Sequence, residues 1–248
     1  MALREELAKS GNWLFRWRSY FPLFIVPILL IALRQSKYLE QTVGETAEYI
    51  WEGLCALVSF SGLVIRCLVV AYAPKRTSGR NTEHQKAETL NTTGLYSVVR
   101  HPLYLGNFFI FLGMVLFVQV VWFAILAVLS FWIYYERIMF AEEEFLRGKF
   151  GKTFLEWSKK TPAFWPRFRN WQQPALTFSF KNILKREYTA FFLIIASFTL
   201  LDLAGDVFTR GKLQIDIVWV TLFIIGLIVY LVLRTLRTKT RILHVEGR

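Results

Sequence analysis

The strongest constraint on the fold of this chain is a series of long apolar segments separated by charged ones. Of its 248 residues 54% are hydrophobic, yet the formal net charge is +12. A bilayer accommodates both properties, because lipid tails accept apolar side chains and anionic headgroups attract cations. A membrane-spanning helix needs roughly 17–25 apolar residues. About six segments approach this length, the first being the shortest: Phe21–Leu33, Tyr49–Ala73, Leu103–Val118, Val120–Tyr135, Thr189–Leu203 and Ile215–Leu233.

The placement of lysine and arginine predicts the orientation of these spans. Twenty-five of the 30 lysines and arginines lie in segments on the same side of the membrane as the N-terminus. Four lie on the opposite side, and Arg66 lies within a span. Such a bias is typical of cytoplasmic loops. The sequence therefore predicts an all-α, polytopic transmembrane protein with about six spans and both termini in the cytoplasm. We expect it in a bacterial inner membrane or the endoplasmic reticulum, with its functional site facing the cytoplasm.

Composition divides the chain into four predicted parts. Residues 1–48 form an N-terminal segment with the first span, and residues 49–168 form a core with spans two to four and a cytoplasmic helix. Residues 169–187 are an interfacial linker, and residues 188–248 are a two-span hairpin with a basic tail. The motifs described next all lie in the core.

Arg66 lies inside the second predicted span, roughly 10 Å from its cytoplasmic end at the helical rise. An arginine at such a position is unfavourable by at least about 2.5–3.5 kcal/mol, so it usually faces a partner or a wet cavity. In a structural interpretation, the Arg66 side chain extends to the lipid headgroups or pairs with a carboxylate such as that of Glu52. A functional interpretation, which we favour, has its guanidinium bind a carboxylate or phosphate of a lipid substrate through two parallel hydrogen bonds.

A second polar feature stands at the start of the third span, in the sequence Arg100-His101-Pro102-Leu-Tyr104. Pro102 suits the first turn of a helix, where its fixed φ and missing N–H are tolerated. The helix N-terminus presents N–H groups and a partial positive charge, which favour a carboxylate ligand. Because Tyr96 and Tyr104 flank the turn, we expect a ligand site here in preference to a plain helix cap.

Three consecutive glutamates, Glu142, Glu143 and Glu144, follow the fourth span. On a cytoplasmic helix such a run is usually a solvated face with pairing to cations one turn away. Glu142 lies shortly after the apolar residues and can instead point into a pocket under His101. From charge alone, the two interpretations are equally supported.

Neither a metal nor a nucleic acid is expected as a partner. The chain has three histidines and two cysteines without the spacing of a zinc site. Aromatic and basic residues alternate between Phe164 and Trp171, a pattern that in a polytopic membrane protein suits anionic lipid headgroups better than nucleic acid. Asp202, Asp206 and Asp216 lie towards the outer ends of the last two spans, where we expect them to be solvated.

The motifs of the core resemble a known family in their order and spacing. They are Gly62-x-x-x-Arg66, Thr89-Leu90-x-x-x-Gly94-x-Tyr96, Arg100-His101-Pro102-x-Tyr104-x-Gly106 and Glu142-Glu143-x-x-Leu146-x-x-x-Phe150-Gly151, closed by Pro162 and Pro166. Together they resemble the isoprenylcysteine carboxyl methyltransferase family, within the wider group of membrane phospholipid methyltransferases. The resemblance covers about Gly62–Pro166, less than half of the chain.

This resemblance implies that S-adenosylmethionine binds in a cytoplasmic-side pocket and leaves as S-adenosylhomocysteine. The residues it assigns to the cofactor are Thr89, Leu90, Tyr96, Arg100, His101, Pro102, Tyr104, Glu142 and Glu143. Arg66 matches the intramembrane arginine that lies near the acceptor oxygen. Arg137 is displaced by one position from the family's arginine ahead of the glutamate pair. Both arginines are predicted to be catalytic.

The sequence thus predicts an integral-membrane methyltransferase that O-methylates a carboxylate or phosphate of a membrane lipid or lipidated substrate. An amine acceptor is a cation that must first lose a proton, and Arg66 would repel it. N-methylation of a phospholipid amine is therefore the alternative. An alternative of a different class is a non-catalytic membrane scaffold or small transporter. Polar residues would then be spread across several spans, whereas here they gather at the cytoplasmic end.

Overall fold

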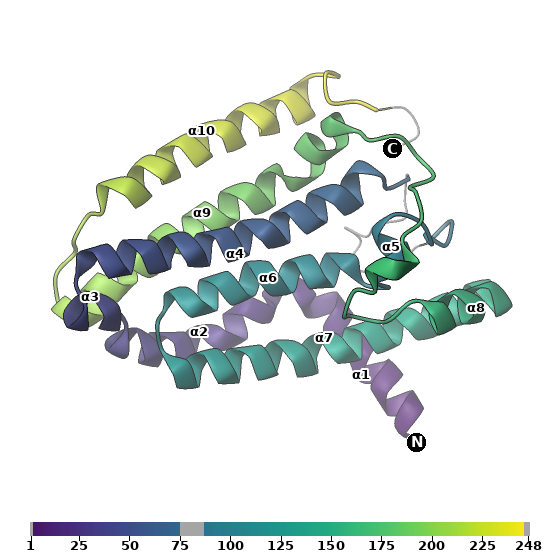
Figure 1. Cartoon of the computed structure of the whole chain (residues 1–248), viewed down its shortest axis with the longest axis horizontal. Coiled ribbons are helices and arrows are strands. Elements are labelled where there is room, and N and C mark those ends of the chain that lie inside the picture. The colour runs from purple at the N-terminus through teal and green to yellow at the C-terminus, as the bar shows by residue number, and fades with distance from the viewer. Residues whose placement is uncertain (1, 75–86, 246–248) are drawn as a thin grey trace.

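The fold is an elongated bundle of helices, seen in a computed structural model that describes residues 2–74 and 87–245. The helices are α1 Leu3–Trp17, η1 Arg18–Tyr20, α2 Phe21–Ala32, η2 Leu33–Gln35, α3 Tyr38–Thr42, α4 Glu45–Ala71, α5 Leu95–Val98, α6 Pro102–Phe117, α7 Val121–Phe150, α8 Lys152–Lys160, η3 Phe168–Asn170, α9 Phe180–Arg210 and α10 Ile217–Lys239. α4 packs against both α6 and α9, and α10 packs on α9 (Figure 1). The short helices α5 and α8 lie at one end of the bundle, here called the α5 end, and α3 lies at the other, the α3 end (Figure 1).

Among the described residues, four helices are long and apolar enough to cross a membrane: α4, α7, α9 and α10. They correspond to four of the six predicted spans. The other two are shorter in the structure, since α6 has 16 residues and α2 has 12. The all-helical class is confirmed for the described residues. The total of six spans and the cytoplasmic termini stay predictions.

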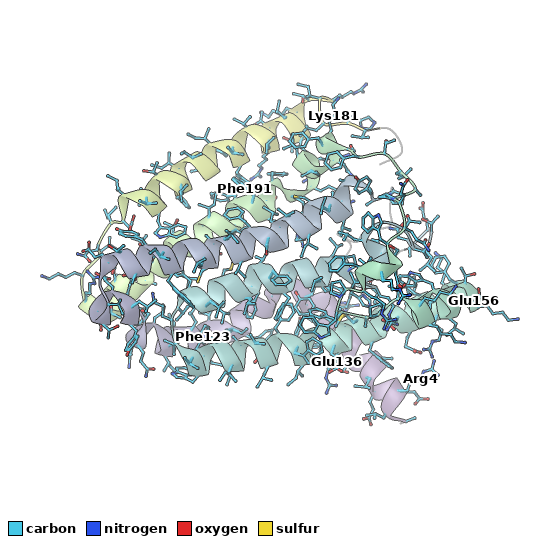
Figure 2. The ribbon with its side chains drawn as sticks, viewed as in Figure 1. Arg4, Phe123, Glu136, Glu156, Lys181 and Phe191 are labelled. Atoms are coloured by element: carbon cyan, nitrogen blue, oxygen red, sulfur yellow. The ribbon has the colours of Figure 1, made fainter. Side chains whose placement is uncertain are left out.

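The outer faces of the long helices are apolar, as lipid contact requires. In the most apolar 18-residue stretch of α10 only 11% of the residues are buried. Ile225 and Ile228 of this helix are more than half exposed. Exposed apolar surface of this extent is unusual in a soluble monomer. Figure 2 shows the charged side chains of Arg4, Glu156 and Lys181 at the α5 end. The bundle therefore has a lipid-facing middle and a polar α5 end.

Small residues let α4 and α6 approach closely. A Cβ atom at Gly106 would lie 2.7 Å from Cγ of Arg66 and 2.8 Å from the carbonyl oxygen of Gly62, closer than packed atoms come. Ser59 Oγ also donates a hydrogen bond of 2.8 Å to the Ile110 carbonyl across the two helices. Glycine and serine at such crossings are typical of helix packing in membranes. This contact fixes the depth at which α4 presents Arg66.

The α3 end holds a buried ionic cluster, so the prediction that Asp202 and Asp206 are solvated is wrong. Asp202 is 1% exposed and Asp206 is 4% exposed. Lys37 Nζ lies 2.5 Å from Asp202 Oδ1, 3.4 Å from Glu48 Oε1 and 3.8 Å from Asp206 Oδ1. Hydropathy alone did not reveal this, because the neutralising lysine lies far away in the sequence. Asp216 caps the N-terminus of α10 by accepting a hydrogen bond from the backbone N–H of Val218.

Replacing Lys37 with methionine should lower the free energy of unfolding by about 3–5 kcal/mol, because it leaves the buried carboxylates of Asp202 and Glu48 without their cation. Burial by itself lowers the pKa of Lys37, but its bond to Asp202 and the charges of Asp202, Glu48 and Asp206 outweigh this and raise it. The part of the stabilisation that depends on the charge of Lys37 is therefore present at neutral pH and is lost as the pH rises through the raised pKa of Lys37. Denaturation in mixed detergent micelles measures the loss. Lys212→Met, an exposed lysine at the same end, should change little; equal effects of the two variants would contradict the prediction.

Candidate active site

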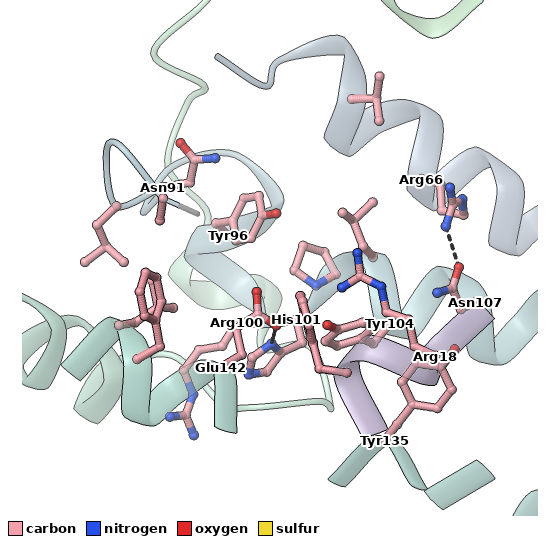
Figure 3. A pocket seen from close by; sticks show the side chains of 18 of the residues that line it. Arg18, Arg66, Asn91, Tyr96, Arg100, His101, Tyr104, Asn107, Tyr135 and Glu142 are labelled. Carbon is pink, nitrogen blue, oxygen red and sulfur yellow. Dashed lines mark hydrogen bonds and ion pairs between the residues drawn. The ribbon is translucent and has the colours of Figure 1, made fainter. Parts of the chain in front are cut away.

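A cavity of about 320 Å³ opens at the α5 end, within the usual size range of small-molecule sites. Figure 3 labels several of the residues that line it: Asn91 lies at one side, His101 and Glu142 lie near the middle, and Arg66 and Asn107 lie at the other side. The lining is drawn from α1, η1, α4, α5, α6, α7, α8 and α9 and from the segment that precedes α5. Its charged residues in the described part of the chain are Arg18, Arg66, Arg100, Arg186, Glu142 and Glu187, with His101 between them. The excess of guanidinium groups favours a ligand that carries an anionic group.

The His-Pro turn forms one wall of this cavity. Pro102 occupies the first position of α6 and His101 is its N-cap residue, as the sequence predicted. Tyr104 lies one turn further on, 5.7 Å from the His101 ring between ring centres and stacked on it. Tyr96 contributes from α5, and its carbonyl oxygen accepts a 3.1 Å hydrogen bond from Trp157 Nε1 of α8. The turn is therefore held from both of its sides by aromatic residues.

The irregular segment after α8 supports the turn from behind. The Arg100 N–H donates to the Pro162 carbonyl at 2.9 Å, and the Arg167 N–H donates to the Val98 carbonyl at 2.9 Å. Phe164, which the alternating aromatic pattern placed among lipid headgroups, is 4% exposed and belongs to the core. This part of the chain thus fixes the backbone of the turn.

The three consecutive glutamates have three different surroundings. Glu143 accepts a 2.6 Å bond from Arg100 and lies 2.9 Å from His101 Nε2, so it holds both residues in place. Glu142 lines the cavity, with Oε2 3.7 Å from His101 Nδ1. Glu144 instead bonds to an arginine of α1 near the surface. The structure therefore supports the pocket interpretation for Glu142 and the solvated one for Glu144.

His101 should stabilise the fold more at acidic than at alkaline pH. Burial lowers its pKa, but hydrogen bonds and charges of Glu142 and Glu143 outweigh this and raise the pKa above its usual value. A raised pKa means that the stabilisation is fully present below the unfolded-state value of about 6.5 and is lost as the pH rises through the folded-state value. The melting temperature of the wild type should therefore exceed that of His101→Gln by a margin that shrinks with rising pH. A margin that grows with pH would contradict this.

Arg66 is held by two residues at the far side of the cavity. Its Nε donates to Glu187 Oε2 at 2.8 Å, one terminal nitrogen donates to Glu187 Oε1 at 3.1 Å, and the other donates to Asn107 Oδ1 at 2.5 Å. The structural partner considered from the sequence, Glu52, is wrong, since Glu52 accepts a bond from Trp219 of α10. Glu187 lies on α9, which begins at Phe180 within the segment predicted as a linker.

The structure brings most of the predicted site residues together. Those that line the cavity are Arg66, Thr89, Leu90, Tyr96, Arg100, His101, Pro102, Tyr104 and Glu142. Glu143 lies behind the turn and acts through Arg100 and His101. Arg137 is not part of the lining, and it donates a 3.3 Å bond to Ser10 of α1. Its catalytic role stays a prediction that the geometry does not favour.

Sequence reasoning missed several residues of the cavity. Asn107 directly follows the last residue of the His-Pro motif, so that motif could have pointed to it. Arg18, Tyr135, Arg186 and Glu187 reach the cavity from η1, α7 and α9. No spacing within a single segment could have identified these four, because only the packing of the helices brings them to the cavity.

Comparison with known proteins gives an independent view of the chain. Over 83 residues the chain is 36% identical to the cobalt-zinc-cadmium resistance protein CzcN of Cupriavidus metallidurans and 35% identical to the nickel-cobalt-cadmium resistance protein NccN of Alcaligenes xylosoxydans xylosoxydans. Each match covers 34% of this chain and 38% of the relative, so the chain spans well under two thirds of either protein. No solved structure matches the chain significantly.

A family match covers the segment that carries the motifs. Residues 55–153 match the phospholipid methyltransferase family. This range contains Arg66, the His-Pro turn and Glu142, which all line the cavity. It ends before α9, so Glu187 lies outside it. The resemblance seen in the sequence is thus confirmed at the level of the wider group: residues 55–153, less than half of the chain, are similar to the phospholipid methyltransferase family.

Proposed function

We propose that this protein transfers a methyl group from S-adenosylmethionine to a carboxylate or phosphate of a membrane lipid or lipidated substrate at the cytoplasmic face. One observation carries the proposal: the cavity joins the His-Pro turn and Glu142 to the guanidinium of Arg66 (Figure 3). The first two belong to the cofactor motifs and the third is suited to the acceptor. The bias of basic residues towards the α5 end supports the cytoplasmic assignment.

The residues around the turn fit S-adenosylmethionine, which supplies an activated methyl group on a sulfonium sulfur. Glu142 offers a carboxylate to a ligand that carries two cationic groups. Arg100 and the first N–H groups of α6 suit the ligand's own carboxylate. Leu90 and Trp157 add apolar surface for its base. The cavity thus has a partner for the charged groups and for the base of the cofactor.

At the other side of the cavity, Arg66 would orient the acceptor. Two parallel N–H groups can hold a carboxylate or phosphate with one oxygen directed at the methyl group, and such placement supplies much of the acceleration in a transfer reaction. An oxygen anion needs no general base. Transfer to it cancels charge, so a cavity shielded from water favours the step. Arg66 therefore binds and positions the acceptor without accepting a proton from it.

Methylation of a phospholipid amine is the second candidate, and Glu187 favours it. Its carboxylate lies beside Arg66, offsets the positive charge and could receive an ammonium group. An amine must lose a proton before it attacks, so Glu187 would then also act as a base. The name of the matched family, phospholipid methyltransferase, agrees with a lipid acceptor in either case.

Radiolabelled S-adenosylmethionine distinguishes these candidates. The purified full chain, reconstituted with a total lipid extract, should bind the label and transfer it to lipid. Alkaline hydrolysis should release the label as methanol from a carboxylate ester, and mass spectrometry should identify a phosphate ester. Label that stays on an amine would establish the second candidate. Absence of cofactor binding would favour the non-catalytic scaffold or transporter.

A further inference from the structure

We infer that Glu187 is a built-in competitor of the acceptor: its carboxylate occupies the Arg66 guanidinium until an acidic acceptor group displaces it. The inference rests on the proposed methyl transfer to an acidic group. It gives the pair of helices α9 and α10 a role, because Glu187 lies on α9, outside the matched segment 55–153. This pair of helices would then select the acceptor, while the matched segment binds the cofactor.

The geometry of the pair defines which acceptors can compete. Glu187 contacts Arg66 side-on, with each carboxylate oxygen on a different nitrogen, at 2.8 and 3.1 Å. A ligand that replaces Glu187 must provide two oxygens at the same spacing. Carboxylates and phosphates do so, whereas a hydroxyl group offers a single oxygen. The pair therefore admits acidic groups and rejects alcohols.

The guanidinium is held still, so the acceptor must come to it. Gly106 leaves just enough room for the Arg66 side chain, since a Cβ there would lie 2.7 Å from Cγ of Arg66. Asn107 fixes one terminal nitrogen at 2.5 Å. The Arg66 side chain is 22% exposed, against 6% for Glu187, and both line the cavity. A ligand entering the cavity thus meets Arg66 in place and has to move Glu187.

Competition within one molecule is strong. A tethered group acts at an effective concentration in the millimolar range. The apparent affinity of an external ligand is its intrinsic affinity multiplied by the fraction of molecules in which the site is free. Glutamine at position 187 keeps the length of the side chain and one oxygen but removes the charge. We therefore expect Glu187→Gln to increase the affinity for an acidic ligand about tenfold.

Octanoate and octanol are suitable probes, because they differ only in the group that would meet Arg66. Calorimetry on the full chain in nanodiscs, corrected with empty nanodiscs, should show about tenfold tighter binding of octanoate to Glu187→Gln than to the wild type. Octanol binding should be unchanged. Glu156→Gln, which alters an exposed glutamate of α8, should match the wild type. Adding Arg66→Gln to Glu187→Gln should abolish the gain.

Equal or weaker octanoate binding to Glu187→Gln would overturn the inference. If that variant is unstable, Glu187→Asp retracts the carboxylate and should give a smaller gain, and no gain would overturn the inference as well. The proposed function is tested separately. Methyl transfer by the wild type without tighter binding in the variants defeats only the inference, whereas tighter binding without any cofactor binding defeats only the function.

Discussion

Replacing Glu142 with glutamine should weaken S-adenosylmethionine binding about ten- to a hundredfold. Hydrogen bonds that involve a charged group contribute about 1.5–3 kcal/mol, and each 1.4 kcal/mol changes affinity tenfold. Glu142 is the member of the glutamate run that lines the cavity, close to His101. Glutamine keeps the shape and removes the charge that faces a cationic ligand. Equilibrium binding of labelled cofactor to the purified variant measures the loss.

Glu144→Gln provides the matched control. Glu144 follows two residues later on the same helix and bonds to an exposed arginine of α1. Exposed ion pairs contribute at most about 1 kcal/mol, and this one does not line the cavity. Cofactor affinity should therefore stay within a fewfold of the wild type. If both variants lose cofactor affinity equally, Glu142 does not contact the cofactor in the way proposed.

The part of the site that follows from local spacing was predictable. Pro102 at a helix start, His101 before it and Tyr104 one turn later lie on one short segment, so helix geometry alone sets their relation. Glu142 could be assigned to the same pocket only through the resemblance, since charge left two interpretations equally supported. Four of the predicted spans also appear as long helices, because their apolar length alone indicates them.

What the sequence could not reveal depends on contacts between distant segments. Glu187 pairs with Arg66 across 121 positions, and Lys37 pairs with Asp202 across 165. Hydropathy marks a charged residue near a span as unfavourable without saying which partner compensates for it. The sequence therefore predicts a solvated Asp202 and places Glu187 in a linker. Arg137 does not line the cavity, because a position close to a motif does not fix the face of the helix on which a side chain lies, and its catalytic role stays a prediction.

Loss of the Arg66 guanidinium should reduce methyl transfer by two to three orders of magnitude. Removing one partner of a buried, hydrogen-bonded charge pair costs about 2–5 kcal/mol, and each 1.4 kcal/mol is a factor of about ten in kcat/KM. Arg66→Ala should have this effect while the affinity for S-adenosylmethionine stays near that of the wild type, since Arg66 lies across the cavity from the His-Pro turn (Figure 3). Arg66→Lys should also be impaired, because an ammonium group cannot form the two parallel bonds.

A loss of activity in Arg66→Ala could also arise because Glu187, 6% exposed, is left without its cation. The double variant Arg66→Ala with Glu187→Ala separates the two causes. It removes both charges, so the melting temperature should recover towards the wild type, since an unpaired buried charge is what destabilises the single variant. If Arg66 positions the acceptor, methyl transfer stays low in the double variant. If transfer recovers together with stability, Arg66 is a structural residue, and the acceptor must be held by another group of the cavity.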